Sequence, residues 1–202
     1  MVFVTTYSSI KERLAQYVAK EIENLYYNIV CKKTNTEKER FMISLKINST
    51  KNFMQKLLRS EIFDVFLLLE GTVITSCSYT IDGRLQKEFY TMEEWEDKSI
   101  CPYEFAKWAD MKELVFQMIK GTHTPVYMKF SLLLRPEIVK QYELAGEESL
   151  IKGYVLNIRY ESGVITCMTG VSYNGFSMDK EPEKLWDKRL QEFFEKNEIE
   201  FE

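Results

Sequence analysis

Residues 61–84 read Glu-Ile-Phe-Asp-Val-Phe-Leu-Leu-Leu-Glu-Gly-Thr-Val-Ile-Thr-Ser-Cys-Ser-Tyr-Thr-Ile-Asp-Gly-Arg. A second stretch, residues 154–175, reads Tyr-Val-Leu-Asn-Ile-Arg-Tyr-Glu-Ser-Gly-Val-Ile-Thr-Cys-Met-Thr-Gly-Val-Ser-Tyr-Asn-Gly. Both alternate apolar and polar residues, which is typical of strands with one buried face. The Val-Ile-Thr at Val73 matches the Val-Ile-Thr at Val164, and Glu70 and Glu161 stand shortly before them. The similarity predicts one structural unit that occurs twice.

Each copy contains two turn signals, so each is predicted to form a three-stranded meander. The first signals are Glu70-Gly71 and Glu161-Ser162-Gly163. The second are Asp82-Gly83 and Asn174-Gly175, which suit a type I′ hairpin because both of its central residues need positive φ.

The repeat extends to both sides of the meanders. Strands at residues 43–49 and 130–136 are each followed by a predicted helix, at residues 50–59 and 137–144, with Ser49 as N-cap and Pro136 as first helical residue. Longer amphipathic helices around Trp108 and Trp186 end the copies. We therefore expect an α+β fold: two tandem β-α-β-β-β-α units with pseudo-two-fold symmetry, at residues 42–122 and 123–202, forming one domain of antiparallel sheets covered by helices. The alternative is that any two amphipathic meanders look alike.

Composition limits the possible functions. The chain has 202 residues, of which 45% are hydrophobic, enough for a packed core. A net charge of −4 argues against coating a nucleic acid, although one local basic face is compatible with it. A membrane-spanning run and a signal peptide are not recognised, so we expect a cytoplasmic protein. The cysteines lack metal-site spacing, so no metal and no cofactor is expected, and Cys77 and Cys167 are predicted to be buried.

Residues 1–41 differ from the repeat. A capping box at Ser9–Glu12 and an apolar stripe predict an amphipathic helix, followed by a polar linker at residues 32–40. This extension is interpreted as a helix packed on the domain or as a docking arm. The apolar stripe consists of Ile10, Leu14, Val18, Ile22, Leu25 and Ile29.

Several segments between Met42 and Asn197 carry a resemblance to a known family. They include Thr-Ile-Asp-Gly-Arg at residues 80–84 and Leu-Asn-Ile-Arg-Tyr-Glu at residues 156–161. In them the chain resembles an uncharacterised family of clostridial cytosolic proteins, a domain of unknown function, which implies no activity. Met42 resembles the usual start of that family, so residues 1–41 are interpreted as an accessory extension or the product of a misplaced start codon.

A weaker, architectural resemblance is to duplicated folds such as the DNA sliding clamp and the TATA-binding protein. It implies a nucleic-acid or partner-docking role on a face with basic residues. Scattered solvated side chains are the alternative interpretation. The candidate contacts are Lys46, Lys51, Lys56, Arg59, Arg84, Lys87 and Arg159.

Enzymatic motifs are not recognised. His123 is the single histidine, and neither a nucleophile elbow nor a phosphate-binding loop occurs. Residues 187–194 resemble the clamp-binding pattern Q-x-x-L-x-x-F-F, with Asp187 in place of Gln, but the same spacing suits a helix that covers a sheet.

The sequence therefore favours a non-enzymatic interaction module that binds protein or nucleic acid through a sheet surface or edge. The alternative is a small-molecule-binding protein or hydrolase, with a pocket between the repeats near Asp82, His123 and Tyr173. The sequence does not determine the oligomeric state, and no membrane association is expected.

Overall fold

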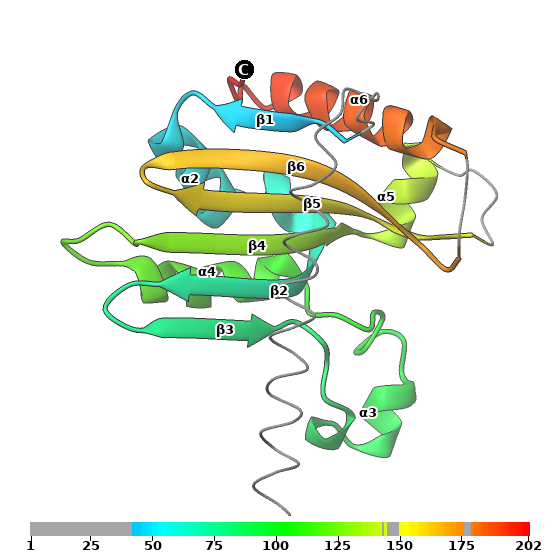
Figure 1. Ribbon diagram of the computed structural model, residues 1–202. Coiled ribbons are helices and arrows are strands. Elements are labelled where there is room, and N and C mark those ends of the chain that lie inside the picture. The colour runs from blue at the N-terminus through cyan, green and yellow to red at the C-terminus, as the bar shows by residue number, and fades with distance from the viewer. Residues whose placement is uncertain (1–41, 143, 145–149, 176–178) are drawn as a thin grey trace, which may run out of the picture. The chain divides into compact units, whose positions relative to one another are not determined.

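Six of the apolar-polar segments form a single antiparallel sheet in the computed structural model of the chain (Figure 1). The order across the sheet is β1-β6-β5-β4-β2-β3. The structure describes residues 42–142, 144, 150–175 and 179–202, so the predicted helix and linker of residues 1–41 lie outside the described part. The strands are β1 (Ser44–Ile47), β2 (Phe66–Ile74), β3 (Ser78–Asp82), β4 (Tyr127–Leu134), β5 (Ile151–Glu161) and β6 (Val164–Tyr173).

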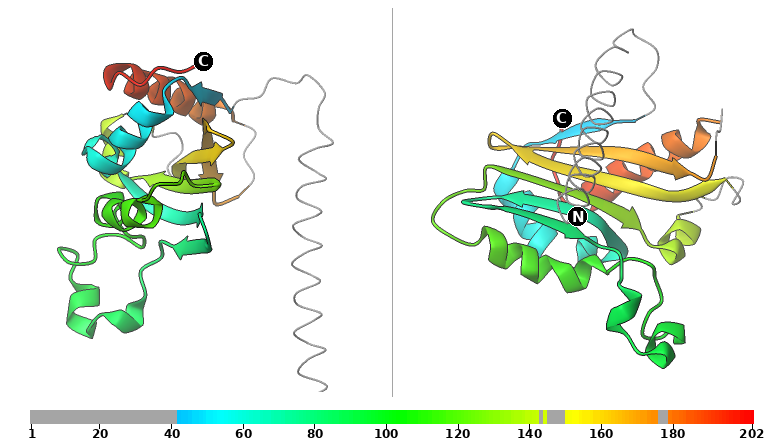
Figure 2. Two further views of the ribbon diagram at one scale, coloured as in Figure 1. Left: turned by 90° about the vertical axis from the view of Figure 1, so that its left-hand side faces the viewer. Right: turned by 60° about the horizontal axis from the view of Figure 1, so that its bottom comes forward.

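Helices cover one face of this sheet. Figure 2 shows α2, α4, α5 and α6 on the same side, and we call the opposite side the open face. The helices are α2 (Thr50–Arg59), α3 (Met92–Glu96), α4 (Trp108–Ile119), α5 (Pro136–Gln141) and α6 (Glu181–Lys196), with short 3₁₀ turns η1 (Ile62–Val65) and η2 (Lys87–Phe89). The fold is therefore α+β, as predicted.

The core lies between the sheet and these helices. Leu156 and Ile158 of β5 face it, together with Leu190 and Phe194 of α6, and all four are buried. Leu190 and Phe194 belong to the clamp-like motif, so that spacing serves packing here. Two tryptophans fix the layers: Trp108 Nε1 donates to the Leu57 carbonyl at 2.9 Å, and Trp186 Nε1 donates to the Val155 carbonyl at 3.0 Å. Both indoles are buried with their N–H groups satisfied.

Local helix signals in the sequence are confirmed. Helix α2 spans Thr50–Arg59 as predicted, and the Ser49 hydroxyl accepts from the Asn52 amide at 3.3 Å. Helix α5 begins at Pro136 and ends at Gln141, shorter than predicted. Both starts deal with backbone N–H groups that have no helical partner: Ser49 accepts one from Asn52, and Pro136 has no N–H to satisfy.

Three of the four predicted turns are wrong. Strand β2 continues through Glu70-Gly71 and turns at residues 75–77, where the Thr75 amide donates to the Cys77 carbonyl. Asp82 is the last residue of β3, Asn174-Gly175 follows β6, and neither pair forms a hairpin. The Asn174 amide donates to the Leu150 carbonyl beside β5. The turn at Ser162-Gly163 forms as predicted, with φ values of 52° and 84°.

The predicted alignment of the two copies is wrong as a result. Val73 lies inside β2 and is buried, whereas Val164 is the first residue of β6 and is 38% exposed. Cys77 is exposed in the β2–β3 turn rather than buried, while Cys167 is buried as expected.

The order β-α-β-β-α does occur twice among the main elements, from β1 to α4 and from β4 to α6. The neighbours differ, however, because β4 pairs with β5 but β1 pairs with β6 instead of β2. The two-fold relation therefore stays a prediction. Within the described residues, no helix combines the length and apolarity needed to cross a membrane.

Candidate functional site

The predicted basic residues lie on different parts of the molecule. Lys46 and Arg159 share one cross-strand row of the open face, each opposite Thr166, whereas Lys56 and Arg59 belong to helix α2. Lys56 donates to the carbonyls of Asn197 and, at 3.0 Å, of Glu198, so it caps the end of α6. The Arg59 guanidinium lies 3.8 Å from the centre of the Phe116 ring on α4. Both side chains therefore hold helices together.

Three other basic residues that were predicted to contact a nucleic acid or a partner form ion pairs within the chain. Lys46 of β1 pairs with Glu202, Arg159 of β5 pairs with Glu161, and Arg84 contacts Glu104 at 2.5 Å. Lys51 on α2 and Lys87 in η2 are exposed. Lys46, Arg84 and Arg159 are thus each paired with a glutamate, which reduces the positive charge that they offer to a phosphate backbone.

The predicted pocket residues do not converge either. His123 is exposed in the connection that precedes β4. Tyr173 ends β6, and burial, followed by the neighbouring Glu183, raises the pKa of its hydroxyl. Asp82 alone among the three lines the cavity described next.

A groove of about 870 Å³ lies on the open face, and we call it the open-face groove. Strands β2, β3, β4, β5 and β6 contribute to it, and residues 102–105 form a wall along one side. Its apolar lining includes Leu67, Leu69, Leu133, Val155, Pro102, Phe105 and Pro136; its polar lining includes Glu70, Asp82, Arg84, Tyr103, Glu104, Ser131, Lys152 and Ser172.

The backbone builds this groove with a bulge and a close crossing. The β2–β4 register shifts between Leu68 and Glu70, so one extra residue is accommodated in β2. The backbone of Gly83 lies so close to β2 that a Cβ atom on Gly83 would be 1.8 Å from the Leu68 carbonyl oxygen. Only glycine permits this approach.

The wall of the groove is hydrogen-bonded to the chain next to this close contact between Gly83 and Leu68. The Ala106 amide donates to the Gly83 carbonyl at 2.8 Å, and the Leu68 amide donates to the Ala106 carbonyl at 2.9 Å. The segment after residue 103 is thereby held between β2 and the chain that follows β3. Tyr103 donates its hydroxyl to Glu137 at 3.1 Å, which ties the wall to α5.

A polar chain crosses the floor. Lys129 Nζ donates to Glu70 at 2.7 Å, and the Ser131 hydroxyl lies 3.2 Å from Glu70 Oε1 and 2.8 Å from Asn157 Oδ1. Ser131 Oγ is the donor in both contacts. Because a serine hydroxyl has one proton, it donates either to Asn157 Oδ1 or to Glu70, and Lys129 supplies the other donor to Glu70. The hydrogen bond from Lys129 lowers the pKa of Glu70 and keeps this carboxylate ionised.

Asp82 is opposite Glu70 in the β2–β3 register. Its carboxylate accepts the Arg84 amide at 2.9 Å, and it forms no ion pair with any described residue. The Arg84 guanidinium is directed to Glu104 instead, and it lies over the Phe105 ring. Asp82 therefore brings a carboxylate without an ion pair among the described residues to a groove whose lining also includes Lys152.

This arrangement suits binding. Ser131 lies between a carboxylate and an amide, and His123 belongs to the other end of β4. Across the described residues, no group of three His, Cys, Asp or Glu side chains could hold a metal ion. The sequence identified Asp82, but it gave Glu70 the role of a strand end and did not single out Ser131 or Asn157. The available signal was that each of these polar residues alternates with apolar residues along its own strand.

Comparison with known proteins gives a family without a known activity. A family model described as "Family of unknown function (DUF5721)" matches residues 56–202. No curated protein matches the chain. No solved structure matches it.

Proposed function

We propose, for a chain that belongs to the DUF5721 family of unknown function, a non-enzymatic role as a module that binds a segment of a partner protein in the open-face groove. The observation that carries this proposal is the groove of about 870 Å³ with its apolar floor and polar rim. Concave apolar surfaces with a few oriented polar groups are the usual form of binding sites.

Charge favours protein over nucleic acid as the occupant. Three carboxylates line the groove: Glu70 and Asp82 on adjacent strands and Glu104 in the wall. Lys129 pairs with Glu70 and Arg84 pairs with Glu104, while Asp82 and Lys152 form no ion pair with any described residue. Asp82 then matches a Lys or Arg side chain, and the leucine-lined floor matches apolar residues on either side of it. We therefore expect a partner segment with one basic residue between apolar ones.

Selection of peptides from a displayed random library against the full chain tests this role. We expect enriched peptides to combine apolar residues with Lys or Arg, and to lose binding to Leu133→Glu, which places a charge on the floor. Asp82→Asn should weaken binding by about tenfold, the equivalent of roughly 1.4 kcal/mol.

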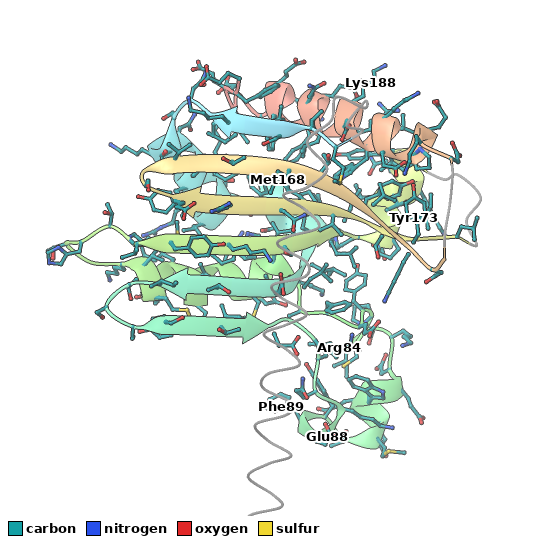
Figure 3. The ribbon with its side chains drawn as sticks, in the orientation of Figure 1. Arg84, Glu88, Phe89, Met168, Tyr173 and Lys188 are labelled. Carbon is teal, nitrogen blue, oxygen red and sulfur yellow. The ribbon has the colours of Figure 1, made fainter. Side chains whose placement is uncertain are left out.

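Met168→Glu is the matched control. Met168 lies on β6, is 37% exposed and does not line the groove (Figure 3). Its variant should bind the selected peptides as the wild type does. Peptides that bind Leu133→Glu unchanged, or that are enriched in acidic residues, would contradict the proposal, as would retention of single- or double-stranded DNA or RNA in a shift assay.

A small-molecule ligand is the second candidate. It is favoured by the convergence of Glu70, Asp82 and Ser131 at one part of the groove, whose volume lies within the usual range of about 300–1,000 Å³ for ligand sites. A thermal-shift screen of apolar amines would support it if the rise in melting temperature disappears in Asp82→Asn and persists in Met168→Glu. A screen without any such rise would reject it.

A further inference from the structure

The two edges of the sheet are finished differently. The outer edge of β1 is closed by the C-terminal residues of the same chain: the Lys46 amide donates to the Glu202 carbonyl at 2.8 Å, and the Glu202 amide donates back at 2.9 Å. At the outer edge of β3, by contrast, no described residue supplies a backbone partner. An edge strand with unpaired N–H and C=O groups is a template for another strand.

The free groups of β3 belong to alternate residues. Gly83 donates to the Leu69 carbonyl and Thr75 donates to the Cys77 carbonyl, which sets the phase of the ladder. Tyr79 and Ile81 therefore bond to β2, while Ser78, Thr80 and Asp82 direct their backbone groups outward. The strand contains neither proline nor lysine, the residues that commonly protect an edge.

We propose that β3 pairs antiparallel with β3 of a second copy of this chain, with the two-fold axis at Thr80. The strand Ser-Tyr-Thr-Ile-Asp is complementary to itself in this register. Ser78 lies opposite Asp82 of the other copy, which pairs a hydroxyl with a carboxylate and avoids opposed like charges. Tyr79 lies opposite Ile81 of the other copy, and aromatic with β-branched pairs stabilise sheets.

Pairing at β3 joins two copies and leaves no edge for a third. As far as the described residues show, each chain offers one open edge, because residues 200–202 occupy the other. An interface that uses the same surface on both partners is consumed when the pair forms, so a dimer results and not a fibre.

An exposed apolar surface lies beside the same edge. Residues 86–101 form an excursion that extends past β3 in the views of Figures 1 and 2. It carries Phe89, which is 82% exposed (Figure 3), and Met92, which is 66% exposed. A second copy paired at β3 would lie next to these side chains and would cover them.

Sedimentation velocity of the full chain over roughly a hundredfold range of concentration tests the proposal, since association depends on concentration. We expect a monomer–dimer equilibrium for the wild type and for Thr80→Val, which keeps the outward N–H. Thr80→Pro removes that N–H without removing a β2 ladder bond, so it should remain monomeric with a near-native circular dichroism spectrum. A monomeric wild type, or a Thr80→Pro variant that dimerises as well as the wild type, would overturn the proposal.

Disulfide trapping provides a readout that does not depend on the proline variant folding. In a Cys77→Ser background, Thr80→Cys places two thiols across the axis at a Cα separation of about 5.5 Å, which suits a disulfide. It should form a covalent dimer under mild oxidation. Ser78→Cys in the same background places equivalent thiols four residues apart in register and should remain uncrosslinked; equal crosslinking of the two variants would refute this register. Because both measurements follow association rather than peptide binding, their failure would leave the role of the groove intact.

Discussion

Gly83 is the residue on which the groove most directly depends. The chain was expected to use Asp82-Gly83 as a hairpin, where glycine provides positive φ. In the structure the only glycine with a φ in that range, among those described, is Gly163. Gly83 is needed because the Leu68 carbonyl lies where a side chain would begin. The sequence thus marks Gly83 as a turn glycine, whereas the structure requires glycine there because two separate segments of the chain approach closely.

Gly83→Ala should lower the free energy of unfolding by about 3 kcal/mol, because a backbone carbonyl must move to admit the new methyl group. Chemical denaturation measures this loss. Gly121→Ala is the control: nothing lies within 4 Å of a Cβ atom at that position, and its change should stay within about 0.5 kcal/mol. Equal effects of the two substitutions would show that the Leu68 contact is not the cause.

Glu70 links the groove to pH. The hydrogen bond from Lys129 lowers its pKa from the ordinary value of 4.5, so its ionised form stabilises the fold above that pH. This contribution is lost as the pH falls through the lowered pKa. The stability difference between the wild type and Glu70→Gln should therefore be largest near neutral pH and shrink in acid.

Urea titrations over a series of pH values measure that difference. Lys129→Met should remove much of the same pH dependence, because the lysine supplies both the hydrogen bond and the opposite charge. A Glu70→Gln variant whose stability differs from the wild type by the same amount at every pH would exclude this role for the carboxylate.

At the scale of elements, helices were predicted better than turns because helix signals are local. Ser49 is followed by a run with an apolar face, and the structure places Phe53, Leu57 and Leu58 of that run in the core. The end of a strand depends instead on pairing across the sheet. Glu70-Gly71 stays inside β2 because both residues pair with β4, opposite Ser131 and Phe130, and a single sequence does not show this pairing.

Ser49→Ala should reduce stability by about 1 kcal/mol, because the Asn52 amide loses its acceptor at the start of α2. Thermal and urea unfolding measure this change. Ser44→Ala, at an exposed position of β1, removes the same hydroxyl from a residue that does not cap a helix, and should be nearly neutral. If Ser44→Ala costs as much as Ser49→Ala, capping does not explain the loss.

At the scale of the whole molecule, the sequence predicted the class and the main helices. It predicted four strands in each unit where the structure has three, and it did not predict the strand order. Alternation shows which residues of β4 and β5 face inward. It does not show that β4 lies between β2 and β5, or that β1 lies beside β6. The groove depends on that order, since its floor combines Leu67, Leu133 and Val155 from three neighbouring strands. The sequence singles out Asp82 through the turn-like pair Asp82-Gly83. That Asp82 lies near Glu70 and Ser131 follows only from the assembled sheet.

The C-terminal segment shows how the finished edge controls association. Residues 200–202 cover β1 with backbone hydrogen bonds to Lys46 and Asn48, and the Phe201 ring lies 5.9 Å from that of Phe194. Deleting these three residues should lower the free energy of unfolding by about 2 kcal/mol, because the hydrogen bonds and a half-buried ring are lost. It also leaves β1 with an unpaired edge.

The deleted chain would then have two open edges, at β1 and β3, and open edges on both sides permit growth beyond a dimer. We expect sedimentation velocity to show species larger than dimers for the deletion. Phe201→Ala, which keeps the covering backbone, should lose stability without forming them. Adding Thr80→Pro to the deletion blocks β3 and should return the assembly to dimers joined at β1. A deletion variant that sediments as the wild type does would show that residues 200–202 stabilise β1 without limiting association.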